Sequence, residues 1–183
     1  DDKEKYRKLS MDLSMLTLQF DQNALKDKNR FELLITDENE LSGLPESARD
    51  AAAMLAKSKD KNGWLFNLSA PSYIPFMRYY DKRDLREKMY REYMSVGNKG
   101  DEFDNKDIIK KIVNIRLEIA QLMGFKNYAE YALEHTMAKN SANVYKLLNQ
   151  LLEAYKPIAI NEYNAVEGFA LGTEKENITV MPW

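Results

Sequence analysis

The sequence predicts a mainly α-helical fold, an irregular array of about eight helices with at most one or two short strands. Three observations predict it. Apolar residues recur at spacings of three and four, capping residues precede these runs, and only 7 Gly and 5 Pro interrupt 183 residues. Hydrophobic residues make up 44% of the chain, which is enough to build a core.

A long helix is predicted over residues 3–34. No Gly or Pro occurs in residues 1–42. One helical face consists of Tyr6, Leu9, Leu13, Leu16 and Phe20. An adjacent apolar stripe suggests that the helix is wedged between other elements, and it consists of Met11, Met15, Leu18 and Leu25.

A short helical turn and a second helix are predicted next. Asp37 is placed to cap the turn, with Glu40 reaching back in a capping box, and Gly43 stops it. Pro45 suits the first turn of a helix that runs to about Lys57. The small residues of that helix permit close packing against a neighbour.

The best strand candidate is residues 64–68, since it is rich in aromatic and apolar residues. Ser72 is predicted to cap a short helix that runs through Tyr80. Asp81 is predicted to cap another helix, which runs to about residue 96. Its expected buried face consists of Leu85, Met89 and Tyr93.

Two further helices follow a polar loop. Asp104 is predicted to cap the first, and Gly124 to end it. Asn127, with Glu130, repeats the capping-box pattern for a shorter helix through Leu133. The apolar stripe of the longer helix consists of Ile108, Ile112, Ile115, Ile119 and Leu122.

The last long helix is predicted to start at Asn140 or Ser141 and to reach about Leu171. Pro157 should kink it, and Gly172 should end it before a tail. No linker, repeat or shift in composition divides the chain. Residues 1–183 are therefore interpreted as a single helical segment.

Composition narrows the possible functions. The net charge is −2, from 27 Lys and Arg against 29 Asp and Glu. This balance gives no strong positive electrostatic field that would attract nucleic acid or an anionic membrane. The absence of Cys excludes disulfides and thiolate chemistry. No apolar run approaches a membrane span and no signal peptide is visible, so a cytoplasmic protein is predicted, with the periplasm possible.

No complete catalytic or metal site is predicted in this chain. His135 is the only histidine and does not stand in an H-E-x-x-H motif, whereas a catalytic zinc needs about three protein ligands. A helix-end histidine that interacts with terminal carbonyls is the favoured interpretation. Residues 101–107 are acidic, but Lys106 occupies the glycine position of a calcium loop, so a solvated loop is favoured.

Substrate-binding residues cannot be assigned from the sequence. An aromatic and basic cluster could line a ligand cleft, although ordinary packing with surface Arg stems is favoured. It consists of Tyr73, Arg78, Tyr79, Tyr80, Arg83 and Arg86. Asn67 and Asn177 each begin an N-x-[ST] sequon, a pattern that is common by chance, and Asn67 is expected to lie in the strand.

A family resemblance begins at residues 64–77, Trp-Leu-Phe-Asn-Leu-Ser-Ala-Pro-Ser-Tyr-Ile-Pro-Phe-Met. With further matches in order, this stretch resembles the thimet oligopeptidase family of zinc metallopeptidases, especially its peptidyl-dipeptidase branch. The further matches are 41–45, Arg83, 86–88, Tyr90, 104–105, Arg116, Ala120, Leu122, 124–125, 127–129, 137–139 and 182–183.

The resemblance implies a largely helical, two-lobed enzyme whose zinc is held by an H-E-x-x-H helix and a later Glu, with the motif Glu as general base. Those residues are not in this chain, so it is predicted to be an inactive fragment that forms part of the channel wall and scaffold. Whether Arg78, Tyr79 or Tyr80 face the channel is left open.

Short peptides are the implied substrates. Release of C-terminal dipeptides is favoured, and oligopeptidase cleavage is the alternative within the family. An alternative of another class is a stand-alone helical scaffold or interaction module. The peptidase interpretation predicts exposed apolar surface on the isolated segment, which could then self-associate.

Overall fold

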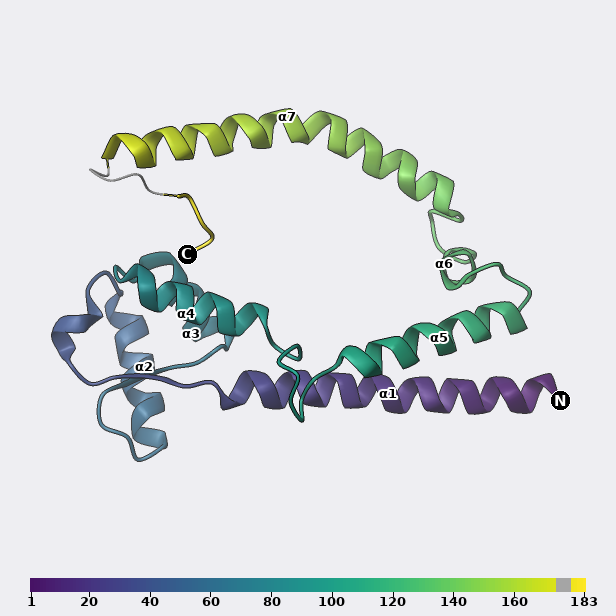
Figure 1. The fold of residues 1–183 in the computed structure, drawn as a ribbon, viewed down its shortest axis with the longest axis horizontal. Coiled ribbons are helices and arrows are strands. Elements are labelled where there is room, and N and C mark those ends of the chain that lie inside the picture. The colour runs from purple at the N-terminus through teal and green to yellow at the C-terminus, as the bar shows by residue number, and fades with distance from the viewer. Residues whose placement is uncertain (174–178) are drawn as a thin grey trace. The chain divides into compact units, whose positions relative to one another are not determined.

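The structure is a computed structural model that describes residues 1–173 and 179–183. These residues form seven α-helices, a 3-10 helix and two short strands, which confirms the mainly helical class (Figure 1). The eighth predicted helix, after Asp37, is the 3-10 turn η1. The elements are α1 (Asp2–Arg30), β1 (Leu33–Ile35), η1 (Glu38–Leu41), α2 (Glu46–Ser58), β2 (Trp64–Phe66), α3 (Ala70–Tyr79), α4 (Arg83–Met94), α5 (Lys106–Leu122), α6 (Tyr128–Leu133) and α7 (Ser141–Thr173).

The chain forms two compact units. One comprises Asp1–Leu13 and Val113–Met181, and the other comprises Ser14–Ile112 and Pro182–Trp183. The boundaries fall inside α1 and α5. That residues 1–183 are one segment of a larger enzyme stays a prediction.

The core of the Ser14–Ile112 unit is built on a two-stranded antiparallel sheet. Leu33 pairs with Phe66 and Ile35 with Trp64. The predicted helix over 3–34 was therefore too long, because α1 ends at Arg30. Phe31, Leu33 and Ile35 are buried in alternation, the period-two pattern of a strand with one covered face.

Small and aromatic side chains close this core. In α2, Ala52 and Ala56 are buried, so the small residues do pack closely as predicted. The ring centroid of Phe76 in α3 lies 4.9 Å from that of Phe66 in β2. Figure 1 shows α2, α3 and α4 gathered near the end of α1 that leads into β1.

The N-cap residue of each predicted capping box is confirmed, whereas the Glu40 and Glu130 carboxylates accept hydrogen bonds from Lys82 and Ser141 instead. The Asp37 carboxylate accepts a hydrogen bond from the backbone N–H of Asn39 at 2.9 Å. The Asn127 side chain accepts one from the backbone N–H of Glu130 at 3.0 Å. Both side chains act within a few residues along the chain, which is why the sequence reveals them.

Two other predicted caps were wrong. Helix α3 begins at Ala70 after Ser69, and the Ser72 hydroxyl instead accepts a hydrogen bond from the backbone N–H of Asn67 at 3.0 Å. Helix α4 begins after Lys82, and Asp81 instead accepts a hydrogen bond from the Ser42 hydroxyl. In both cases the side chain stabilises a loop rather than the helix start.

In the other unit, the elements that follow Val113 are the second part of α5, then α6 and α7, and all three are helices. Ile119 and Ala120 are buried in α5, and Gly124 follows that helix with a φ of +83°, as its predicted end requires. The Arg116 guanidinium carbon lies 5.3 Å from the Tyr128 ring centroid. Helix α7 runs through Pro157 without interruption and is bowed along its length (Figure 1).

We expect Gly43→Ala to destabilise the Ser14–Ile112 unit by about 2 kcal/mol or more. Gly43 has a φ of +84°, and an added Cβ would lie 2.0 Å from the Tyr79 carbonyl oxygen. Gly100→Ala is the matched control, since φ is +71° and nothing lies within 4 Å of its Cβ. Urea denaturation measures both, and equal losses would contradict this account of the close approach.

Candidate functional site

The aromatic and basic cluster of residues 73–86 does not form one surface. Tyr80 is only 1% exposed, its ring packs 4.3 Å from that of Phe76, and its buried hydroxyl has no hydrogen-bond partner among the described residues. Burial raises the pKa of Tyr80. Arg78 and Tyr79 are exposed, with the guanidinium carbon 5.3 Å from the ring centroid.

Arg86 has a structural role within this cluster. Its Nη1 donates hydrogen bonds to the backbone carbonyls of Tyr80 and Asp81, the latter at 2.9 Å. A guanidinium that binds carbonyls here satisfies the acceptors left free at the end of α3. The cation therefore joins α3 to α4.

Tyr73 takes part in a different contact. It stacks on Tyr93 of α4, with ring centroids 4.2 Å apart and planes 21° apart. The pKa of Tyr73 is raised, mainly by burial of the side chain and to a smaller extent by the neighbouring Tyr93. Tyr93 is 38% exposed, so its predicted place on the buried face of α4 was wrong, whereas Met89 is fully buried as expected.

Helix α4 also contacts the ring of Trp183. The Trp183 ring lies 5.3 Å from that of Tyr90, and the Arg91 guanidinium carbon lies 4.9 Å from the Trp183 centroid. Cation–π contacts of this kind contribute about 0.5–1 kcal/mol at exposed sites. Trp183 is thereby anchored on α4.

One fully buried polar side chain, that of Asp27, was not predicted from the sequence. The Asp27 side chain in α1 is fully buried. Its carboxylate accepts hydrogen bonds from the backbone N–H of Gly97 at 2.7 Å and Lys99 Nζ at 3.2 Å, and it forms an ion pair with Arg30 Nε at 2.7 Å. Arg30 also pairs with Asp101, and Lys99 pairs with Glu92 at 2.7 Å.

A buried asparagine extends this contact between α1 and the loop. Asn105 is 2% exposed, and its side-chain nitrogen donates to the Phe20 carbonyl at 3.0 Å. Its side-chain oxygen accepts from Asn23 Nδ2 at 3.1 Å. Its backbone N–H donates to the Gly97 carbonyl at 2.8 Å. The two ends of the 97–105 loop are thus tied to each other and to α1.

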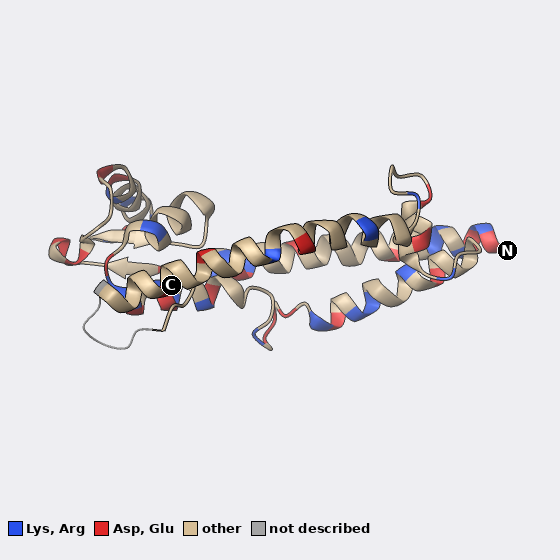
Figure 2. Cartoon of the chain, turned by 90° about the horizontal axis from the view of Figure 1, so that it is seen from above, with Lys and Arg blue, Asp and Glu red and all other residues tan. Residues whose placement is uncertain are grey.

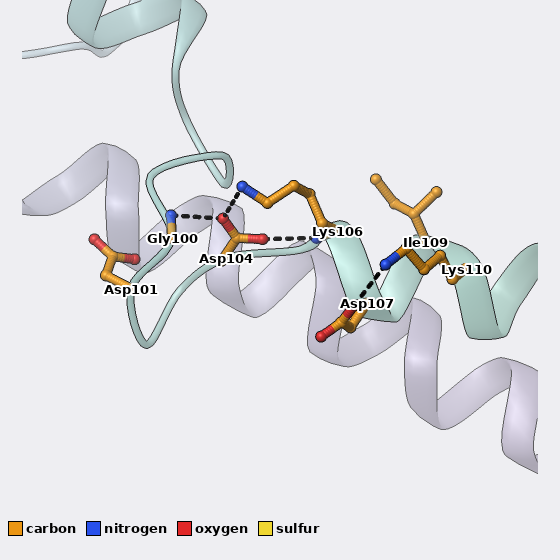
Figure 3. A pocket seen from close by; sticks show the side chains of 7 residues that line it. All are labelled: Gly100, Asp101, Asp104, Lys106, Asp107, Ile109 and Lys110. Carbon is orange, nitrogen blue, oxygen red and sulfur yellow. Dashed lines mark hydrogen bonds and ion pairs between the residues drawn. The ribbon is translucent and has the colours of Figure 1, made fainter.

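The acidic loop surrounds an open depression of about 550 Å³ (Figure 3). Asp104 accepts hydrogen bonds from the backbone N–H groups of Gly100 and Lys106 and pairs with Lys106 Nζ at 2.9 Å. These contacts lower the pKa of Asp104 to about 2, and the Lys106 ammonium is the largest cause. The Asp104 carboxylate thus has its partners within the chain.

The other candidates are dispersed. The His135 side chain is 91% exposed and lies 3.5 Å from the Glu134 carboxylate. Within residues 1–173 and 179–183, no group of three His, Asp or Glu could hold a metal ion.

No helix among the described residues combines the length and hydropathy needed to cross a bilayer.

Asn67 follows β2 rather than lying in it, and its side-chain oxygen accepts a hydrogen bond from the backbone N–H of Ser69 at 3.0 Å. Asn177 lies outside the described residues.

Comparison with known proteins gives a consistent result. Residues 76–183 match Peptidase family M3. Oligopeptidase A of Haemophilus influenzae is 39% identical over 186 residues, which cover 98% of this chain and 27% of the relative. Oligopeptidase A of Escherichia coli is 37% identical over 171 residues, 91% of this chain and 25% of the relative. Dipeptidyl carboxypeptidase of Escherichia coli is 27% identical over 183 residues, 100% of this chain and 27% of the relative.

The helical fold and these matches define a helical segment related to peptidases. The chain belongs to Peptidase family M3. The resemblance to the thimet oligopeptidase family is confirmed at this level. The chain spans about a quarter of the length of the relatives it matches.

We expect Asp27→Ala to lower the free energy of unfolding by about 3 kcal/mol, because it leaves the buried backbone N–H of Gly97 and the partly buried Lys99 ammonium without this acceptor. Asp107→Ala is the matched control, since its pair with Lys110 is exposed and should contribute at most about 1 kcal/mol. Urea denaturation at neutral pH compares the variants. A similar loss in both would contradict a special role for Asp27.

Asp104 should contribute stability that depends on pH. Its pKa falls from 3.8 to about 2 on folding, so the stabilisation is complete above the unfolded value and is lost as the pH falls through the folded value. The difference in urea midpoint between the native chain and Asp104→Asn should therefore be constant at neutral pH and shrink between about pH 4 and pH 2. A difference that does not change with pH would contradict the assignment.

Proposed function

We propose that this chain is a helical, non-catalytic part of a longer zinc-dependent peptidase that cleaves short peptides. The observation that carries the proposal is the match of residues 76–183 to Peptidase family M3. The relatives named oligopeptidase A support it, since they align with nearly the whole chain. Their additional length leaves room for a catalytic region outside this segment.

The described residues do not fit a catalytic zinc. The single histidine, His135, is exposed and accompanied by one carboxylate, whereas such a site needs about three protein ligands around the metal. Zinc in the whole enzyme would polarise the scissile carbonyl and activate water. This segment would contribute rigid helices that position the walls of the peptide channel, and alone it would be inactive.

Between the two activities in the family, we favour oligopeptidase cleavage. Identity to the bacterial oligopeptidase A proteins is 37–39%, and identity to the dipeptidyl carboxypeptidases is 26–27%. The resemblance of residues 64–77 to the peptidyl-dipeptidase branch favoured the release of C-terminal dipeptides. That activity is kept as the second candidate. The predicted cytoplasmic location stays a prediction, because plant relatives are named as cytosolic and as organellar.

The test uses the longer protein encoded by the parent gene beside the 183-residue chain. With an internally quenched peptide, we expect the longer protein to cleave, a chelator to abolish cleavage and zinc to restore it. The 183-residue chain at equal concentration should not cleave. Cleavage that resists the chelator would contradict the zinc mechanism.

Mass spectrometry of the products separates the two activities. An oligopeptidase should cut internal bonds of a peptide whose C-terminus is amidated. An enzyme that releases C-terminal dipeptides should produce dipeptides together with the peptide shortened by two residues at a time, and amidation should block it. The second pattern would contradict the branch that we favour.

A further inference from the structure

Helix α7 exposes an unusual amount of apolar surface for a 33-residue helix. Phe169 is 73% exposed and Tyr145 is 65% exposed. In Figure 2 the long helix is mostly tan, with few charged residues along it. Its exposed large apolar residues are Tyr145, Leu147, Leu148, Leu151, Leu152, Tyr155, Ile158, Ile160, Tyr163, Val166, Phe169 and Leu171.

These side chains are not spread evenly around the helix. At 3.6 residues per turn, all but Ile160 and Leu171 fall within an arc of about 160°. We call this arc the apolar face of α7. It consists of Val144, Tyr145, Leu147, Leu148, Leu151, Leu152, Tyr155, Ile158, Tyr163, Val166 and Phe169.

Charge is distributed in the opposite way. Glu162 is the one charged residue inside the apolar face, and it lies at the middle of the arc. Lys156 lies at the edge, and Lys146, Glu153 and Glu167 lie on the other side of the helix. A carboxylate surrounded by apolar groups requires a cation or hydrogen-bond donors when the face is covered.

Two other occupants fit less well. A membrane-surface helix is typically rich in Lys and Arg on its polar side, whereas this side has mainly Asn, Gln and Glu. In a symmetric pair of α7 helices that cross at Glu162, the two Glu162 carboxylates would be brought together without a cation. Chain outside the present sequence is available, because the relatives are almost four times as long as the matched segment.

We propose that the apolar face of α7 is the docking surface for another part of the same peptidase chain, outside these 183 residues. The docked part presents apolar side chains and a Lys or Arg opposite Glu162. This inference rests on the proposed function, since it requires the longer polypeptide. Helix α7 lies wholly within the stretch that matches Peptidase family M3.

Two adjacent substitutions test the proposal. Leu151→Lys places a charge in the apolar face, and Gln150→Lys places the same charge on the other side of the same turn. In the longer protein, Leu151→Lys should lower the thermal midpoint strongly and Gln150→Lys should leave it nearly unchanged. In the 183-residue chain, where Leu151 is 43% exposed, neither should have a large effect.

Hydroxyl-radical labelling gives an independent measurement on the unmodified proteins. Tyr155, Tyr163 and Phe169 should be labelled in the 183-residue chain and protected in the longer protein. Lys146, on the polar side, serves as the internal control and should react equally with an amine reagent in both.

Three results would overturn the docking surface. The first is equal labelling of the tyrosines in both proteins. The second is protection in the monomeric 183-residue chain, which would mean that the chain covers its own face. The third is protection of that chain that increases with its concentration, which would identify a second copy. Zinc-dependent cleavage is measured separately on the longer protein, so its loss would contradict the proposed function while the labelling still tests the docking.

Discussion

A buried carboxylate is the constraint on which the Ser14–Ile112 unit depends. Burying a charge is unfavourable unless donors surround it, and Asp27 obtains them from its own helix and from the loop at 97–99. The loop must therefore lie against α1 at that point. Asn105 then fixes the other end of the loop on the same helix, and α5 starts from there. About two turns of α1, from Phe20 to Asp27, thus hold the loop that connects α4 to α5.

Local signals explain why most of the helices could be predicted. Asn127 and Gly124 act on groups a few residues away, so their effect can be read from the sequence. The strand β1 could not be found in this way. Residues 31–34 contain no breaker, and they become extended because Trp64–Phe66 supplies the pairing partner, about 30 residues further on. Ser72 and Asp81 were misassigned because loop contacts outweighed helix capping.

The polar contacts were only partly predictable. Asp27 lies seven residues after Phe20, on the stripe that predicts the buried face of α1, so its burial could have been foreseen. Its partner Gly97, 70 residues away, could not. The neighbours Tyr79 and Tyr80 illustrate the same limit. They lie about 100° apart around the helix axis, so one is exposed and the other joins the core, although the sequence gives both the same side chain.

The chain has one apolar core that is buried within its own unit and one apolar helix face that is exposed. Phe66, Leu68 and Phe76 are fully covered by their own unit, so that core is complete. The apolar face of α7 is exposed. Burying apolar surface stabilises a folded protein by roughly 25 cal/mol per Å² of that surface. Among residues 1–173 and 179–183, no group of His, Asp and Glu side chains is arranged to hold a metal ion. In the peptidase proposed above, the exposed apolar contacts of α7 would fix the positions of helices, and substitutions in its apolar face would act on catalysis through those positions.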